Sequence, residues 1–148
     1  MFTDSRKDIK NNELKGMTLL IVGCGIDLIE INRIKKIIER WGDNFTFRVF
    51  TPLERKYCEK KKNNKYLSYA GRFASKEALL KALGLGLRGA NWKEIEVNNN
   101  EFGQPIIKIK GKLNEIISKK GVSKYFLTIS HTKDYALAEV ILEGLSHK

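Results

Sequence analysis

The clearest pattern of apolar and polar positions lies between residues 65 and 84, where it predicts a long helix that ends at Gly84. Residues three and four apart share one face of a helix. One such face carries Ala70, Phe73, Ala74, Glu77, Ala78 and Lys81. Glu and Lys are seldom buried unless paired, so this face either borders a cleft or lets Glu77 and Lys81 pair with each other, as on any exposed helix.

The chain before this helix predicts a strand followed directly by another helix. Residues 19–26 are apolar and predict a buried strand, and residues 27–34 predict the start of the helix, with Asp27 at the junction. Apolar positions continue at helical spacing to Trp41 and form one stripe against the core. Three basic residues share the opposite side: Arg33, Lys36 and Arg40. Their charge alone leaves open whether this side is a solvated face or a binding surface.

The rest of the chain predicts an α+β fold. The run Thr51-Pro52-Leu53-Glu54 is a good helix start, because Thr suits the N-cap, Pro the first helical position and an acid the third. This helix should run to about Lys62. Four strands and a short basic helix follow the long helix: strands 92–97, 105–109, 125–130 and 135–142, and helix 111–120. This order favours an antiparallel sheet packed against a long central helix over regular βαβ winding.

A glycine-rich run follows the long helix. Residues 84–89 spell GxGxxG, but a dinucleotide-binding fingerprint must follow a strand and open a helix, and this run follows a helix. The sequence therefore excludes that type of site here. Gly84 and Gly86 permit close backbone approach to a ligand, and Arg88 could reach its phosphate; the alternative is a flexible connector.

Length and charge narrow the class of protein. The chain has 148 residues, 42% of them hydrophobic, which suits one core and predicts a single domain at 17–148 behind a flexible extension, residues 1–16. Its formal net charge of +11 predicts an acidic partner: nucleic acid, an anionic membrane surface, a phosphorylated small molecule or an acidic protein. The longest apolar run, 17–22, is too short to span a bilayer. Two widely separated cysteines indicate neither a disulfide framework nor a zinc cage, so we expect a reduced, cytoplasmic setting.

Two carboxylates from different elements indicate a metal site. Mg²⁺ takes one or two protein carboxylates and keeps its other positions for water and substrate phosphates, which suits Asp27 and Glu77. Lys81, one helical turn from Glu77, would neutralise further phosphate oxygens, and Lys76 or Arg72 could extend the positive field. Phosphoryl transfer needs mostly positioning and charge stabilisation, so such a site would suffice.

Three motifs in this order resemble the holo-acyl-carrier-protein synthases, which are small bacterial-type 4'-phosphopantetheinyl transferases. The motifs are Gly25-Ile26-Asp27 with Ile31, Arg33 and Ile34; Phe73-Ala74-Ser75-Lys76-Glu77-Ala78 with Lys81; and Ile129-Ser130-His131-Thr132 with Tyr135-Ala136. The resemblance covers about residues 17 to 144. It implies the fold of that family and the transfer of phosphopantetheine from coenzyme A to a serine of apo acyl carrier protein, in fatty acid biosynthesis, with release of adenosine 3',5'-bisphosphate.

The resemblance also implies roles for individual residues. Asp27 and Glu77 would bind Mg²⁺ and act in catalysis together with Lys81. Substrate would be bound by Arg72, Lys76, Gly84, Gly86, Arg88, His131 and Thr132. The helix with Arg33, Lys36 and Arg40 would dock the acidic carrier protein. The family further implies a homotrimer with sites between subunits, and the residues leave open whether Glu77 or a water takes the serine proton.

Two other functions are compatible with the sequence. A nucleic-acid-binding domain has only the charge in its favour, because no RNA-recognition aromatic pair, helix-turn-helix pattern or zinc finger is present. A carrier-binding protein without catalysis is the second alternative. A hydrolase built on Ser130 and His131 is excluded, because adjacent residues of a strand point to opposite faces. We therefore expect neither nucleic acid nor membrane as a partner.

Overall fold

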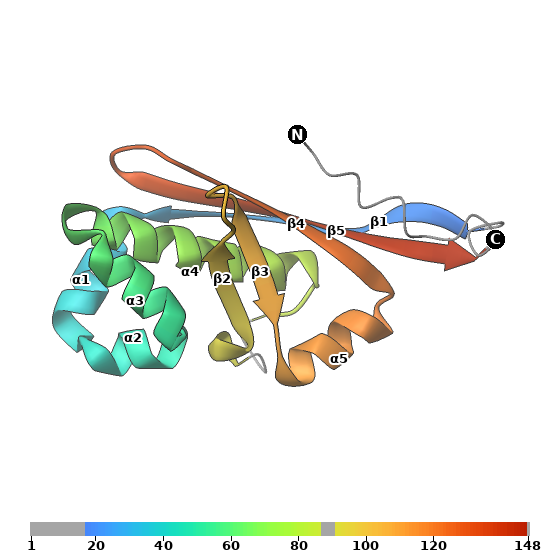
Figure 1. Ribbon diagram of the computed structural model, residues 1–148, viewed down its shortest axis with the longest axis horizontal. Coiled ribbons are helices and arrows are strands. Elements are labelled where there is room, and N and C mark those ends of the chain that lie inside the picture. Colours follow the sequence, from blue (N-terminus) through green and yellow to red (C-terminus); the bar gives the residue numbers. More distant parts are fainter. Residues whose placement is uncertain (1–16, 87–90, 148) are drawn as a thin grey trace.

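A long helix lies along one face of a three-stranded antiparallel sheet in the computed structural model, which describes residues 17–86 and 91–147 (Figure 1). The order in the sheet is β1-β5-β4, and the elements are β1 Met17–Glu30, β4 Val122–His131, β5 Tyr135–His147 and the helix α4 Lys65–Ala82. The sheet turns the buried residues Ala136, Ala138 and Val140 of β5 toward the core that it shares with α4. The predicted α+β fold, with an antiparallel sheet against a central helix, is confirmed.

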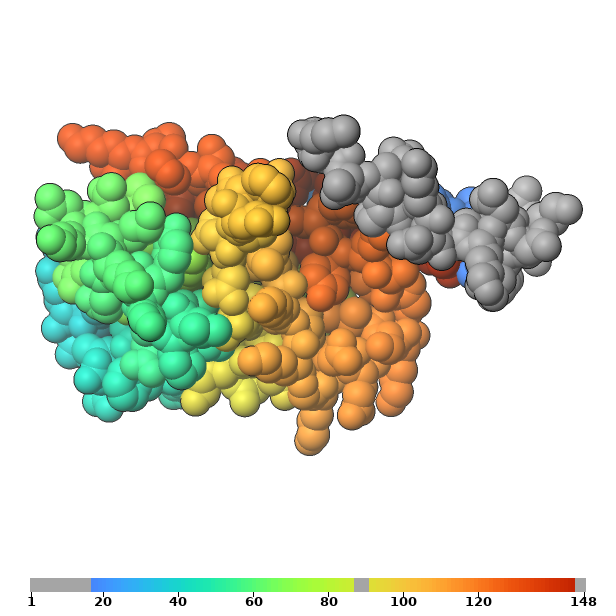
Figure 2. Space-filling view, viewed as in Figure 1, coloured from blue at the N-terminus to red at the C-terminus, as the bar shows by residue number. Residues whose placement is uncertain are grey.

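The shorter elements pack around α4. They are α1 Ile31–Trp41, α2 Asp43–Val49, α3 Pro52–Lys60, the 3₁₀ turns η2 Lys62–Asn64 and η3 Trp92–Glu94, the two-stranded sheet of β2 Ile95–Asn99 and β3 Pro105–Ile109, and α5 Gly111–Lys119. Helices α1 to α3 gather at one end of α4, and the β2–β3 hairpin crosses it (Figure 1). In the space-filling view this hairpin stands on the surface between the three helices and α5 (Figure 2).

Strand β1 lies unusually close to α4. A Cβ atom on Gly25 would collide with the carbonyl oxygen of Ala78 and lie 2.5 Å from the backbone nitrogen of Ala82. A Cβ atom on Gly23 would collide with the carbonyl oxygen of Ala82. Only glycine allows a backbone to come this near to another, so these two positions fix how the strand and the helix pack.

The predicted start of α3 is confirmed. Thr51 Oγ1 accepts a hydrogen bond from the Glu54 backbone N–H at 3.3 Å, and Glu54 Oε2 accepts one from the Thr51 N–H at 2.8 Å. This reciprocal pair satisfies two N–H groups that the first turn of a helix leaves free. The helix ends at Lys60, slightly before the predicted Lys62.

The prediction for residues 19–34 was wrong in two respects. The strand runs through Asp27 to Glu30, and the helix begins only at Ile31, because residues 27–30 pair with β5 in register, Asp27 opposite Ala138. The strand is also not buried: Leu19 and Ile21 are 63% and 67% exposed, and Leu20 on the other face is 45% exposed. This part of β1 precedes Gly23, which already lies against Ala82, the last residue of α4. A continuous apolar run predicts burial on both faces, which this edge strand does not have.

Some expectations lie beyond what the structure describes. The predicted extension, residues 1–16, and Arg88 are outside the described residues. The division into an extension and one domain at 17–148 therefore remains a prediction. No helix within the described ranges is long and apolar enough to cross a membrane.

Candidate active site

Strand β1 and helix α4 bring three of the predicted catalytic residues together. The ammonium group of Lys81 donates a hydrogen bond to Asp27 Oδ1 at 2.9 Å and another to the carbonyl oxygen of Ile26 at 3.0 Å. The Asp27 side chain is mostly buried, whereas that of Lys81 is half-exposed. The ion pair therefore lies at the surface, where a ligand can reach the lysine.

Glu77 shares this environment with Asp27. Partial burial raises the pKa of Glu77, the nearby Asp27 carboxylate raises it further, and Lys81 opposes both effects. Two carboxylates that repel each other cost free energy, which a cation between them would relieve. The strand and the helix thus bring two acidic groups close enough to influence each other, and their joint role as metal ligands stays a prediction.

The donor set suits a hard divalent cation. No group of three or more His, Cys, Asp or Glu residues that could hold a metal occurs in the part of the chain that the structure describes. A site with two carboxylates and an open side matches Mg²⁺, which binds through one or two carboxylates plus substrate phosphates. Asp27 and Glu77 would hold such an ion, and Lys81 would face the bound phosphate.

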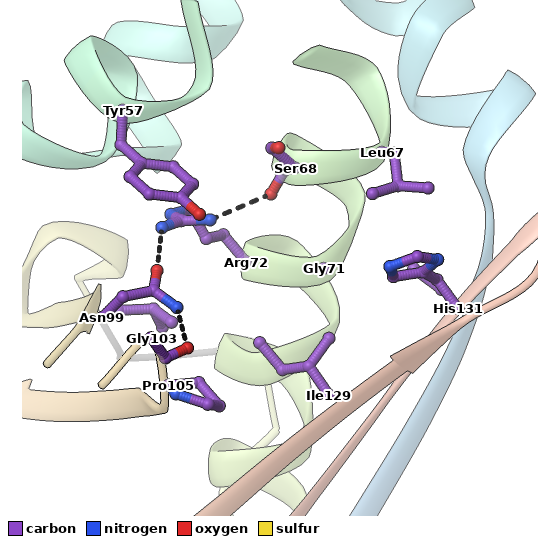
Figure 3. Close-up of a pocket in the computed structure, with 12 residues that line it drawn as sticks. Tyr57, Leu67, Ser68, Gly71, Arg72, Asn99, Gly103, Pro105, Ile129 and His131 are labelled. Atoms are coloured by element: carbon purple, nitrogen blue, oxygen red, sulfur yellow. Dashed lines mark hydrogen bonds between the residues drawn. The ribbon is translucent and has the colours of Figure 1, made fainter. Parts of the chain in front are cut away.

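A cavity of about 250 Å³ opens on the side of α4 that faces the β2–β3 hairpin and the end of β4. Its walls include Arg72 and His131, two of the predicted substrate-binding residues (Figure 3). Tyr57, Asn99 and Pro105 also border it. The cavity therefore combines a permanent cation, a histidine and apolar walls, a combination that suits a nucleotide.

Arg72 is held firmly in this cavity. Its side chain is only 5% exposed, its guanidinium lies 3.9 Å from the centre of the Tyr57 ring, and Nη2 donates to Asn99 Oδ1 at 3.0 Å. The Asn99 amide in turn donates to the carbonyl oxygen of Gly103 at 2.9 Å within the hairpin, so the bond from Arg72 to Asn99 ties this hairpin to α4 (Figure 3). The Arg72 Nε atom is buried with no hydrogen-bond partner among the described residues.

Two further residues that were predicted to bind substrate lie at the end of β4 and in the turn after it. His131 closes β4 and lines the cavity. Thr132 Oγ1 accepts hydrogen bonds from the backbone N–H groups of Asp134 and Tyr135, at 3.3 and 3.1 Å. The Thr132 hydroxyl thus shapes the turn into β5, next to the histidine.

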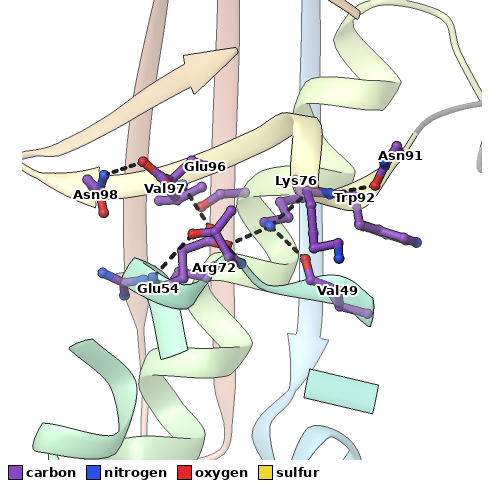
Figure 4. Close-up of polar contacts among 12 residues, drawn as sticks. Val49, Glu54, Arg72, Lys76, Asn91, Trp92, Glu96, Val97 and Asn98 are labelled. Carbon is purple, nitrogen blue, oxygen red and sulfur yellow. Dashed lines mark hydrogen bonds and ion pairs between the residues drawn. The ribbon is translucent and has the colours of Figure 1, made fainter. Parts of the chain in front are cut away.

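Lys76 does not belong to this site, which corrects the prediction that it binds substrate. Its side chain is fully buried, and Nζ donates to Glu54 Oε2 and to the carbonyl oxygen of Val49, both at 2.7 Å, and to that of Trp92 at 3.1 Å (Figure 4). Burial lowers the pKa of Lys76, and the Glu54 carboxylate opposes this effect. All three protons of the ammonium group have acceptors, so Lys76 is a structural residue of the core.

The structure describes two of the glycines that follow α4, Gly84 and Gly86. Gly84 has a positive φ of 68°, as expected of a residue that ends a helix, and its N–H donates to the Lys81 carbonyl oxygen at 3.0 Å. A Cβ atom on Gly86 would meet no atom of the described residues within 4 Å. The predicted phosphate contacts of this run remain a prediction, since Arg88 lies outside the described residues.

The basic side of α1 is exposed. Arg33, Lys36 and Arg40 all face solvent, while Ile34 is buried beneath them. This arrangement leaves the three cations free to meet an acidic surface. The role of α1 in docking stays a prediction.

Sequence reasoning missed Tyr57 and Asn99. Both reach Arg72 from elements distant in the chain, so no local pattern connects them. The turn-forming run of asparagines before Gly103 was the sole local signal, and it predicts a hairpin rather than a contact with α4.

Comparison with known protein families identifies the fold and the activity class. Residues 23–140, which include Asp27, Glu77, Lys81 and His131, match the model of the 4'-phosphopantetheinyl transferase superfamily. The chain belongs to this superfamily of enzymes. The predicted resemblance is therefore confirmed.

Individual relatives of this 4'-phosphopantetheinyl transferase are acyl-carrier-protein synthases. The holo-[acyl-carrier-protein] synthase of Halothermothrix orenii is 43% identical over 124 residues, which cover 84% of this chain and 98% of that protein. An acyl carrier protein synthase of Plasmodium yoelii with ADP bound is 35% identical with a TM-score of 0.76, and covers 86% of this chain and 98% of its own. A holo-(acyl-carrier-protein) synthase of Bacillus anthracis in complex with CoA (3',5'-ADP) is 37% identical with a TM-score of 0.69, and covers 84% and 97%.

Proposed function

We propose that this transferase moves the 4'-phosphopantetheine group of coenzyme A to a serine hydroxyl of apo acyl carrier protein, with Mg²⁺ as cofactor. The observation that carries the proposal is the meeting of Asp27, Glu77 and Lys81 between β1 and α4. The same helix carries Arg72, which lines the cavity on its side toward the β2–β3 hairpin. The relatives named above, one of them crystallised with coenzyme A, support the choice of both substrates.

The reaction exchanges one phosphorus–oxygen bond for another. The serine oxygen attacks the phosphorus that bears pantetheine, the bond to the bridging oxygen of the diphosphate breaks, and adenosine 3',5'-bisphosphate leaves with the bonding electrons. The serine proton passes to a base, either Glu77 or a water molecule. Lys81 stabilises negative charge on the phosphate oxygens.

Asp27 and Glu77 would hold the Mg²⁺ ion, which would supply charge neutralisation at the diphosphate. The partly buried pair of carboxylates supports this assignment, because their mutual repulsion is relieved by a cation. The half-exposed ammonium of Lys81 places the ion pair at the surface, although Asp27 itself is mostly buried.

The cavity beside the hairpin is assigned to the nucleotide end of coenzyme A. The positive charge of Arg72 would attract a phosphate, and His131 would add a hydrogen bond. Tyr57 and Asn99 hold the guanidinium in place, so it would lose little conformational entropy on binding.

The carrier protein would dock on α1, where Arg33, Lys36 and Arg40 are exposed. The net charge of +11 supports an acidic partner. We also propose a homotrimer in the cytoplasm that serves fatty acid biosynthesis. The uncovered face of the sheet, with the exposed Ile26, Leu28 and Phe126, supports self-association.

The test is a mass measurement on the carrier. The full chain is incubated with coenzyme A, apo acyl carrier protein and Mg²⁺, and the carrier is weighed before and after. A gain that equals phosphopantetheine, lost when Mg²⁺ is chelated, is the expected result. No gain would refute the proposal, and tight binding of RNA or DNA in place of a gain would point to the nucleic-acid alternative.

A further inference from the structure

We propose that Gly25 is a positioning residue of the active site: by letting β1 lie directly on α4, it sets the separation of the Asp27 and Glu77 carboxylates. This inference rests on the proposed function, because the separation matters for a shared cation. Gly25 would then serve the active site without contacting the substrate.

The steric evidence is direct. The place where a Cβ atom of Gly25 would stand is filled by the backbone of α4 at Ala78 and Ala82. Backbone atoms of a helix cannot rotate away as a flexible side chain can. Any side chain at position 25 would therefore push β1 and α4 apart.

The contact is also in the right place. Ala78 and Ala82 directly follow Glu77 and Lys81 in the sequence, and Asp27 is two residues after Gly25 on the same face of β1. The Lys81 ammonium bonds both the Ile26 carbonyl oxygen and the Asp27 carboxylate. A shift of β1 at Gly25 would thus change the distances from Asp27 to both Lys81 and Glu77.

The competing explanation is that the glycine serves packing alone. Gly23 provides a matched control, because a Cβ atom there would collide with the same helix, at the carbonyl oxygen of Ala82. Gly23 is four residues from Asp27, and the nearest helix atoms to its Cβ position belong to Ala82, whereas Gly25 also meets Ala78, the residue after Glu77. If packing were the whole role, the two glycines would behave alike.

The experiment compares Gly25→Ala and Gly23→Ala in the full chain. Mn²⁺ and Mg²⁺ affinities are measured by titration, stability by urea unfolding, and kcat and KM by the carrier assay. We expect both variants to lose stability, whereas only Gly25→Ala loses metal affinity, by tenfold or more, and lowers kcat with little change in KM for coenzyme A. Displacements of about 1 Å in a positioned site can cost about a hundredfold in rate. Equal metal affinities in the two variants would overturn the proposal.

A second variant keeps the test decisive if Gly25→Ala does not fold. Asp27→Glu lengthens the carboxylate by one methylene, so in a gap fixed by the strand and helix it should lower metal affinity at least tenfold while stability is kept. In the Gly25→Ala background the same change should restore part of the lost affinity. Wild-type affinity in Asp27→Glu would overturn the proposal. The metal titrations do not depend on turnover. A wild-type protein that binds the metal but modifies no carrier would refute the proposed function. The comparison of metal affinities between the variants would still decide the role of Gly25.

Discussion

Replacing Glu77 by Gln should abolish the stabilisation of this protein by Mg²⁺. A ligand that binds only the folded state stabilises it by about 2.7 kcal/mol at a concentration one hundred times its Kd. For a chain of this size each kcal/mol shifts Tm by roughly 2–4 °C, so the wild-type protein should gain about 5–10 °C. The variant keeps one carboxylate, Asp27, and its Mg²⁺-dependent shift should fall below about 2 °C, since much of the metal affinity comes from the second carboxylate.

The same substitution has an opposite effect without metal. The pKa of Glu77 is raised in the folded protein, so the folded state holds the proton more tightly than the unfolded state. Stability therefore decreases as the pH rises from the unfolded pKa through the folded one, and above that window the ionised carboxylate destabilises the fold. At pH 8 without metal, Glu77→Gln should be at least as stable as the wild type.

The assay is thermal unfolding at pH 8 and again near pH 5, with MgCl₂ or NaCl at matched ionic strength. Glu115→Gln removes the same charge from an exposed position on α5 and should keep the full Mg²⁺ shift. Lower pH should reduce the wild-type shift, because the proton competes with the metal for Glu77. A wild-type shift in Glu77→Gln would refute the assignment of this residue as a ligand.

Three other substitutions test the remaining parts of the structure. Arg72→Met should raise KM for coenzyme A about 10- to 100-fold in steady-state kinetics, the equivalent of one charge-assisted hydrogen bond; an unchanged KM would remove the nucleotide from that cavity. Lys76→Met should lower the free energy of unfolding in urea by about 3–5 kcal/mol, because Glu54 would stay buried without its cation; a loss below about 1 kcal/mol would contradict the buried pair. Arg33→Glu should raise KM for the carrier and weaken its dependence on salt, whereas Lys119→Glu on α5 should change neither; equal effects would argue against docking on α1.

The sequence predicted features that depend on residues close in the chain. The capping of α3 by Thr51 and Glu54 is a matter of three residues, and the shared face of Glu77 and Lys81 follows from the helical period. The positions of these two residues on α4 were therefore predictable. Their approach to Asp27 was reached through the motif resemblance.

The errors arose where partners are distant in the chain. Lys76 lies on the buried face of α4, and only Glu54, which precedes it by 22 positions, explains how its charge is accommodated. The strand conformation of Asp27 depends on pairing with Ala138 near the other end of the chain. The apolar positions around Asp27 suit a helix as well as a strand, so the local pattern could not decide between them.

One buried carboxylate connects elements that would otherwise unfold separately. Glu54 accepts hydrogen bonds from Thr51 at the start of α3, from the Val97 N–H of β2 at 2.8 Å and from Lys76 in α4. Opening any one of these elements leaves the charge without part of its shell, so the three should exchange their amide protons as one cooperative unit. The wall of the cavity that Val97 and Arg72 line would then persist through the small fluctuations that release fraying helix ends.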